Sequence, residues 1–195
     1  MPRRSTSLTE TPSQTAGPYV HIGLVPAQAG FEIFERNFSN HIAGAGPRIR
    51  ISGRVFDGIG APITDVLVES WQADAEGRFD GPGFRGWARA ASDFDSGEWV
   101  IETVRPGAVA EPGGTVLAPQ IGLWIVARGI NIGLSTRIYF PEEAAANAAD
   151  PVLSRVPPHR RGTLLAQKQG VEGDVQGYRF DIVVQGEGET VFFDA

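Results

Sequence analysis

The chain has 195 residues, no cysteine and a formal net charge of −6 at pH 7. Such a length suits one domain that buries about 70% of its unfolded surface, and the lack of cysteine excludes disulfides and thiolate sites and suits a reducing cytoplasm. The acidic balance, with no Lys/Arg run longer than two residues, argues against nucleic acid as a partner. The longest uninterrupted apolar runs, such as residues 123–127, are far too short to span a membrane.

The first 47 residues differ in pattern from the rest. Residues 1–19 lack periodicity and contain ETPSQTAGPY. Proline fixes φ and glycine permits close backbone approach, so we predict an extended arm that packs against another surface. No apolar stretch follows the two N-terminal arginines, so we expect no secretory signal. Residues 31–37, FEIFERN, predict a short helix.

From about residue 48 the pattern is that of strands. Short apolar runs alternate with polar residues, and turns rich in glycine and proline separate them. The predicted strand regions are 48–57, 63–74, 97–107, 119–130, 132–140, 177–186 and 189–195. Because no helices alternate with these strands, the sequence predicts an all-β fold, an antiparallel β-sandwich. One helix is predicted in residues 141–153, which have a proline at the start and acidic residues in the first turn, and a further helical turn in 157–169.

Few residues in the sequence suggest chemistry. The three histidines, His21, His41 and His159, lie in predicted loops or the arm, so they could bind a metal only by long-range convergence. No nucleophile elbow, P-loop or dinucleotide fingerprint is present. On the residues alone, the interpretation stops at an all-β domain.

Residues 127–140, ARGINIGLSTRIYF, predict a strand on which Asn131 and Gly133 share one face. Arg128 is the one charged residue in a nearly apolar block from Ile121 to Leu134. Its guanidinium could pair with a carboxylate or loop carbonyls, or it could clamp an anionic ligand. Trp71 lies in an alternating strand and is predicted to be in the core. Tyr19 could anchor the arm or line a pocket, and the pattern favours packing.

Several segments together resemble the intradiol ring-cleavage dioxygenases, and among these the alpha-type subunit of the two-subunit enzymes. The segments are residues 10–24, 53–79, 94–107, 127–140 and 177–194, which follow in order over nearly the whole chain. The strand with WQADAEGR is typical of the wider superfamily. The motifs SQTAGPY, ARGINI and GEGETVFF are typical of the alpha-type subunit.

The resemblance implies that the metal positions of the family have lost their ligands here. In the iron-bearing subunit, two tyrosines and two histidines hold Fe(III), and the matching positions are Phe79, Val109, Asn131 and Gly133. Phenylalanine lacks the phenolate oxygen, valine and glycine offer no donor, and asparagine is a poor ligand for a hard trivalent ion. The resemblance therefore implies that this chain does not bind the catalytic iron.

The resemblance also implies a partner, a homologous beta subunit that binds the Fe(III), in a higher-order alpha–beta assembly. The active site of the family lies where the two subunits meet. Carried over residue by residue, Thr15, Gly17, Pro18 and Tyr19 of the arm and Arg128 should line the substrate cleft. A cationic side chain suits an anionic aromatic ligand.

The reaction implied by the family is insertion of O2 between the two hydroxyl-bearing carbons of protocatechuate, which gives 3-carboxy-cis,cis-muconate. The expected organisation is an N-terminal arm and linker in residues 1–47, packed on the partner, and a β-sandwich dioxygenase-like domain in residues 48–195. The expected location is the cytoplasm.

Two other interpretations fit parts of the sequence. A β-sandwich binding or structural module could have kept the fold and lost the chemistry, but nothing in a sandwich core requires SQTAGPY together with Arg128. A self-sufficient dioxygenase with relocated ligands would have to use the three histidines and the tyrosines Tyr19, Tyr139 and Tyr178. None of these falls at an expected ligand position.

Overall fold

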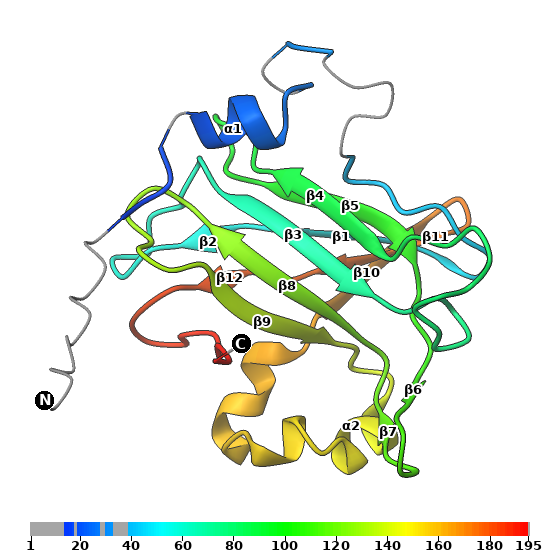
Figure 1. Ribbon diagram of the computed structural model, residues 1–195. Helices are drawn as coiled ribbons and strands as arrows, with labels where there is room; N and C mark the ends of the chain where they lie inside the picture. Colours follow the sequence, from blue (N-terminus) through cyan, green and yellow to red (C-terminus); the bar gives the residue numbers. More distant parts are fainter. Residues whose placement is uncertain (1–13, 18, 28–29, 33–38, 195) are drawn as a thin grey trace, which may run out of the picture.

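The computed structural model describes residues 14–17, 19–27, 30–32 and 39–194. Most of its strands form two four-stranded sheets that pack face to face (Figure 1). One sheet has the order β10 (Gln167–Glu172), β11 (Val175–Arg179), β1 (Arg48–Gly53), β5 (Trp99–Val104). The other has the order β4 (Trp87–Ala91), β3 (Leu67–Gln72), β8 (Gln120–Val126), β9 (Leu134–Tyr139). The predicted all-β sandwich is confirmed.

Two small sheets and four short helices complete the described fold. The small sheets pair β2 (Val55–Phe56) with β12 (Ile182–Val183) and β6 (Val109–Ala110) with β7 (Val116–Leu117). The helices are α1 (Tyr19–Leu24), α2 (Ala144–Ala149) and the 3₁₀ helices η1 (Leu153–Arg155) and η2 (Pro158–Leu164). Pairing is antiparallel except for β1 with β11 and β2 with β12, which are parallel.

The core lies between the two large sheets because apolar residues alternate along the central strands. Ile49 and Ile51 of β1 and Ile125 of β8 are at most 1% exposed, and Trp99 at the start of β5 is fully buried. Burial of apolar surface contributes about 25 cal/mol per Å². This core therefore fixes the two large sheets against each other, and with them the connections between their strands.

The outward face of the β4-β3-β8-β9 sheet corrects one prediction. Trp71 is 53% exposed, whereas Ser70 and Gln72 of the same strand are buried. The Gln72 amide donates to the carbonyl of Val104 at 2.9 Å and accepts from the Thr103 hydroxyl at 2.8 Å. Because these hydrogen bonds satisfy the buried amide, β3 places Val68, Ser70 and Gln72 on its buried face, and the prediction of a core Trp71 was wrong.

Other differences concern element boundaries. The predicted helix in 141–153 is present as the shorter α2 followed by η1, since Asp150 accepts hydrogen bonds from the backbone of Val152 and Leu153 and ends α2. The predicted helical turn in 157–169 is present as η2, but residues from Gln167 on form the edge strand β10. Most of the helix predicted in 31–37 lies outside the described residues. Among the described residues, no helix has the length and apolar character needed to cross a membrane.

Candidate functional site

The described part of the arm lies against the connection between β8 and β9, residues 127–133. The backbone N–H of Gly129 donates to the Thr15 hydroxyl at 2.7 Å, and the backbone N–H of Gln14 donates to the Asn131 carboxamide oxygen at 2.6 Å. These bonds join residues more than 110 positions apart in the chain. Figure 1 shows this segment beside the end of the β4-β3-β8-β9 sheet, at the end opposite α2 and η2. The arm and the connection thus form one surface.

The Arg128 side chain projects from this surface, and its Nε atom is held by a hydrogen bond. The Nε atom donates to Asp65 at 2.7 Å, and the Arg128 side chain is 70% exposed while Asp65 is 18% exposed. Within the part of the chain that the structure describes, no bond to the two terminal nitrogens of the guanidinium is found. The carboxylate partner that the sequence left open is therefore Asp65, and the outer edge of the fork stays available to a ligand.

A small hollow lies beside Arg128. Its volume is about 140 Å³, and it is lined by Ala16, Gly17, His21, Asp65, Phe94 and Arg128. Gly17 and Arg128, two residues predicted for the substrate cleft, thus line one hollow, and Thr15, a third, is bonded to Gly129 next to Arg128. Tyr19, the first residue of α1, is 82% exposed and does not line this hollow. Pro18 lies outside the described residues.

Two residues at this hollow were not singled out from the sequence as a pair: His21 and Asp65. His21 is only 8% exposed although it belongs to the arm, and its ring lies 5.2 Å from that of Phe94. Burial lowers the pKa of His21, against the opposing effect of the Asp65 carboxylate, so the ring is neutral near pH 7. The only signal in the sequence was a polar residue directly before each apolar run, which is too common to single them out.

The positions matched to the metal ligands are not arranged as predicted. Asn131 and Gly133 lie in the connection and not in a strand, because β9 begins only at Leu134. The chain turns at Gly129, whose φ is +88°, a conformation that favours glycine. The prediction that Asn131 and Gly133 share a strand face was therefore wrong. The Asn131 oxygen is instead occupied by the backbone of Gln14.

Aromatic rings fill the space at two of these positions. A Cβ atom added to Gly133 would lie 2.3 Å from the indole nitrogen of Trp124, so no side chain fits there unless the indole moves. Phe79 stacks on Trp71 with ring centroids 5.8 Å apart and planes 5° apart. Val109 lies in β6 and is paired with Leu117.

These residues do not fit a ferric ion. Asn131 supplies a neutral amide, Phe79 and Val109 supply hydrocarbon, and an indole takes the space at Gly133. Among the described residues, no group of three or more His, Asp or Glu side chains could hold a metal ion. His21, His41 and His159 are not brought together into such a group.

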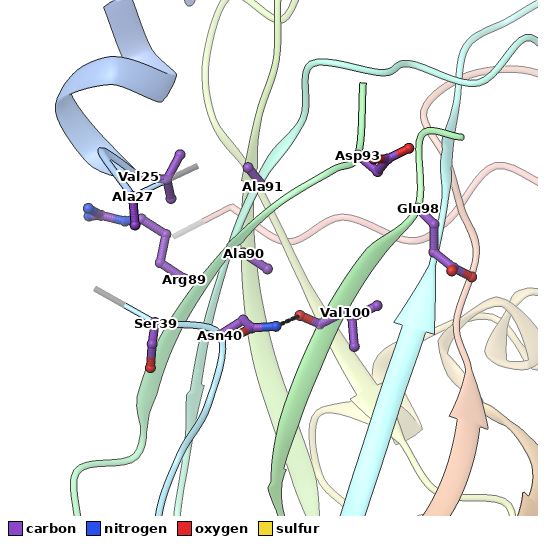
Figure 2. A pocket seen from close by; sticks show the side chains of 10 residues that line it. All are labelled: Val25, Ala27, Ser39, Asn40, Arg89, Ala90, Ala91, Asp93, Glu98 and Val100. Atoms are coloured by element: carbon purple, nitrogen blue, oxygen red, sulfur yellow. Dashed lines mark hydrogen bonds between the residues drawn. The ribbon is translucent and has the colours of Figure 1, made fainter. Parts of the chain in front are cut away.

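A wider hollow, about 380 Å³, lies elsewhere, between β4, β5 and the chain near Ser39 (Figure 2). Its polar groups are already bonded within the protein. Arg89 donates to Glu69 at 2.7 Å and to the Leu24 carbonyl at 2.8 Å, and the Asn40 amide donates to the Val100 carbonyl at 3.0 Å. Residues 33–38, which directly precede this wall, are outside the described residues, so we assign no ligand here. The Arg89 contacts instead fix α1 on the sheet.

Comparison with known proteins gives consistent results. Residues 34–186 match the dioxygenase family described as Dioxygenase_C. The chain is 48% identical to a protocatechuate 3,4-dioxygenase alpha chain of Pseudomonas putida over 96% of this chain and 97% of the relative. It is 33% identical to a protocatechuate 3,4-dioxygenase beta chain of Burkholderia cepacia over 74% of this chain and 67% of that one.

Among solved structures, the chain is similar to the dioxygenase domain of a dioxygenase carbohydrate-binding protein fusion from Streptomyces sp. SirexAA-E. The TM-score is 0.57 at 26% identity, over 91% of this chain and 99% of that one. The likeness thus covers the sandwich as a whole and not one local motif.

Proposed function

The chain belongs to the intradiol ring-cleavage dioxygenase family, and we propose that it is the alpha subunit of a protocatechuate 3,4-dioxygenase, the subunit that binds no iron. Its partner is a homologous beta chain, which carries the Fe(III) and with which it forms an alpha–beta assembly in the cytoplasm. The family match extends to beta chains at 33% identity, which supports a partner of the same fold.

One observation carries this proposal. The arm at Thr15 is bonded to the connection that bears Arg128, and in that same connection the indole of Trp124 takes the space of a side chain at Gly133, one of the matched metal positions. The polar, substrate-facing part of the site is therefore present without the metal-facing part. A chain that completes a partner's site needs the first and not the second.

In this proposal each residue has a specific task. The outer nitrogens of Arg128 bind the carboxylate of protocatechuate, and Asp65 keeps the guanidinium in place from behind. Gly17, which has no atom within 4 Å of the site of an added Cβ, leaves room for the aromatic ring. Thr15, Pro18 and the exposed ring of Tyr19 extend the wall toward the partner.

The ferric ion of the partner supplies the chemistry that joins O2 to the ring. This chain contributes orientation: it holds the carboxylate end of the substrate so that both hydroxyl groups point away from Arg128. Residues 1–47 form the arm and linker that pack on the partner, and residues 48–195 form the sandwich domain, in which the first strand begins at Arg48.

The competing function is a sandwich module that works without a catalytic partner. The two functions differ in what the chain does when it is alone and when it is paired. We would express the chain alone and together with a beta chain, and measure iron content, visible absorbance and protocatechuate-dependent O2 uptake. We expect an iron-free, colourless chain alone and a coloured, active complex when paired. A chain that forms no complex with a beta partner would contradict the proposal.

Arg128→Gln tests the substrate contact within that complex. A charge-assisted hydrogen bond to a carboxylate is lost, so KM for protocatechuate should rise about tenfold. The iron content should be unchanged, because Arg128 belongs to the iron-free chain. Loss of iron from the complex would show that Arg128 supports the metal site and not the substrate.

A further inference from the structure

His21 is a buried polar side chain that the proposed function does not yet use. The ring is 8% exposed, and within the described residues its Nε2 atom is buried without a hydrogen-bond partner. Buried polar atoms are nearly always bonded, so an unbonded ring nitrogen in a residue that lines a hollow points to a role for that ring. The hollow in question is the one beside Arg128, which is wide enough for a few water molecules at about 30 Å³ each.

The ring lies at the meeting point of the segments that make up the site. It projects from α1, whose end is held to β4 by the bond from Arg89 to the Leu24 carbonyl. Asp65 and Arg128 line the same hollow, and both act electrostatically on the ring. The turn after β4 contributes the ring of Phe94. Of the carboxylates in that turn, Asp93 accepts bonds from the Asp95 and Ser96 backbone, and Asp95 is exposed.

We propose that His21 is a positioning residue for the substrate contact of Arg128: the buried ring, Asp65 and Arg128 act as one unit that fixes the guanidinium beside the arm. This inference rests on the proposed function. His21 lines the same hollow as Asp65 and Arg128 and packs on Phe94, so its ring holds α1 beside the ion pair. The consequence is selectivity for catechols that carry a carboxylate over those that do not.

The charge of the ring matters to this arrangement. When His21 is neutral, the Asp65 carboxylate is paired with the Arg128 guanidinium without a competing cation from the ring. A proton on His21 would place a second cation in the hollow, which attracts Asp65 and repels Arg128. Burial disfavours that proton, so the arrangement holds near pH 7 and weakens in more acidic solution.

The test compares two ligands on the alpha–beta complex. Protocatechuate carries the carboxylate and catechol lacks it, so the ratio of their Kd values, measured without O2, reports on the contacts to the carboxylate. The variants are His21→Phe, which keeps the packing on Phe94, and His21→Gln, which places an amide near Nε2. His159→Phe is the matched control, since His159 is exposed and distant in the chain. Arg128→Gln gives the full effect as a reference.

We expect His21→Phe to weaken protocatechuate binding about threefold to tenfold while catechol binding, kcat and iron content stay the same. His21→Gln should recover part of the loss. In the unsubstituted complex the protocatechuate preference should fall as the pH drops below the ordinary histidine value of 6.5, and in His21→Gln it should be constant over that range. The control should match the unsubstituted complex.

Two failures can be told apart. If Arg128→Gln reduces the preference for protocatechuate but His21→Phe and His21→Gln do not, the positioning role is wrong and the proposed function stands. If Arg128→Gln itself leaves the preference unchanged, the substrate contact in the proposed function is wrong, and this inference falls with it. Should His21→Phe fail to assemble, the pH dependence of His21→Gln decides the matter.

Discussion

The two ends of the connection between β8 and β9 have opposite characters, although they are only five residues apart. At one end Arg128 keeps its charge, 70% of its side chain is exposed, and its base is held by Asp65. At the other end Gly133 lies directly under the indole of Trp124, with no room for a side chain. The comparison shows that an exposed cation and a position closed to any side chain lie within one short loop, because each depends on different neighbours.

The largest expected effect comes from adding a side chain at Gly133, the end of the connection that the Trp124 indole closes. Gly133→Ala places a Cβ 2.3 Å from the indole nitrogen of Trp124, and overpacking of this kind costs about 1–3 kcal/mol. We expect a loss of that size in the free energy of unfolding, measured by denaturant titration.

The control for this substitution is Gly162→Ala. Gly162 has no atom within 4 Å of an added Cβ and no positive φ, so the alanine should be nearly neutral. Adding Trp124→Ala to Gly133→Ala should make the two effects non-additive, since the pair shares the same space. Equal effects of Gly133→Ala and Gly162→Ala would show that the indole moves aside freely and that the end is not closed.

This contrast shows what the sequence could and could not predict. The absence of metal donors at Phe79, Val109, Asn131 and Gly133 follows from residue type once the family pattern is matched. The rings that take the space do not follow, because Trp124 and Trp71 come from other strands. Alternation along β3 predicted a buried Trp71, which was wrong, because hydrogen bonds between Gln72 and a different sheet place the other face of the strand inward.

The other end of the connection, at Arg128, was predictable to a similar degree. Arg128 stood out as the one charge in an apolar block, and the sandwich followed from short strands between turns. The partner Asp65 and the buried His21 could not be predicted, since their roles arise where the arm, α1 and two connections meet. Strand periodicity fixes which face a residue takes, but it carries no information on contacts between distant segments.

The next effect in size concerns the support behind Arg128. Asp65→Asn keeps the shape of the side chain and removes the charge that holds Nε at 2.7 Å. We expect KM for protocatechuate in the alpha–beta complex to rise about threefold, a modest change because the guanidinium is largely exposed. A fall in KM would be the opposite result. It would mean that the charge of Asp65 weakens the attraction of Arg128 for the substrate carboxylate more than Asp65 helps by positioning Arg128.

A smaller effect is expected where the arm is attached. Thr15→Val removes the hydroxyl that accepts from the Gly129 backbone at 2.7 Å, while Thr15→Ser retains it. This bond is exposed, so its loss should cost about 0.5–1 kcal/mol at most and raise KM about twofold. If the valine and serine variants have the same KM, the bond does not fix the arm in the complex.

The smallest expected effect is on the pH dependence of stability, and it bears directly on His21. Burial lowers the pKa of His21 below the ordinary value of 6.5, so between these two values the unfolded chain binds a proton that the folded chain does not. The free energy of unfolding should therefore fall as the pH drops below 6.5, and this loss should be absent in His21→Gln. Carboxyl groups ionise near pH 4, which is below this range. His159→Gln is the control, because His159 is exposed. If the free energy of unfolding depends on pH in the same way in His21→Gln as in the unsubstituted chain, the His21 ring takes up a proton as readily in the folded chain as in the unfolded one.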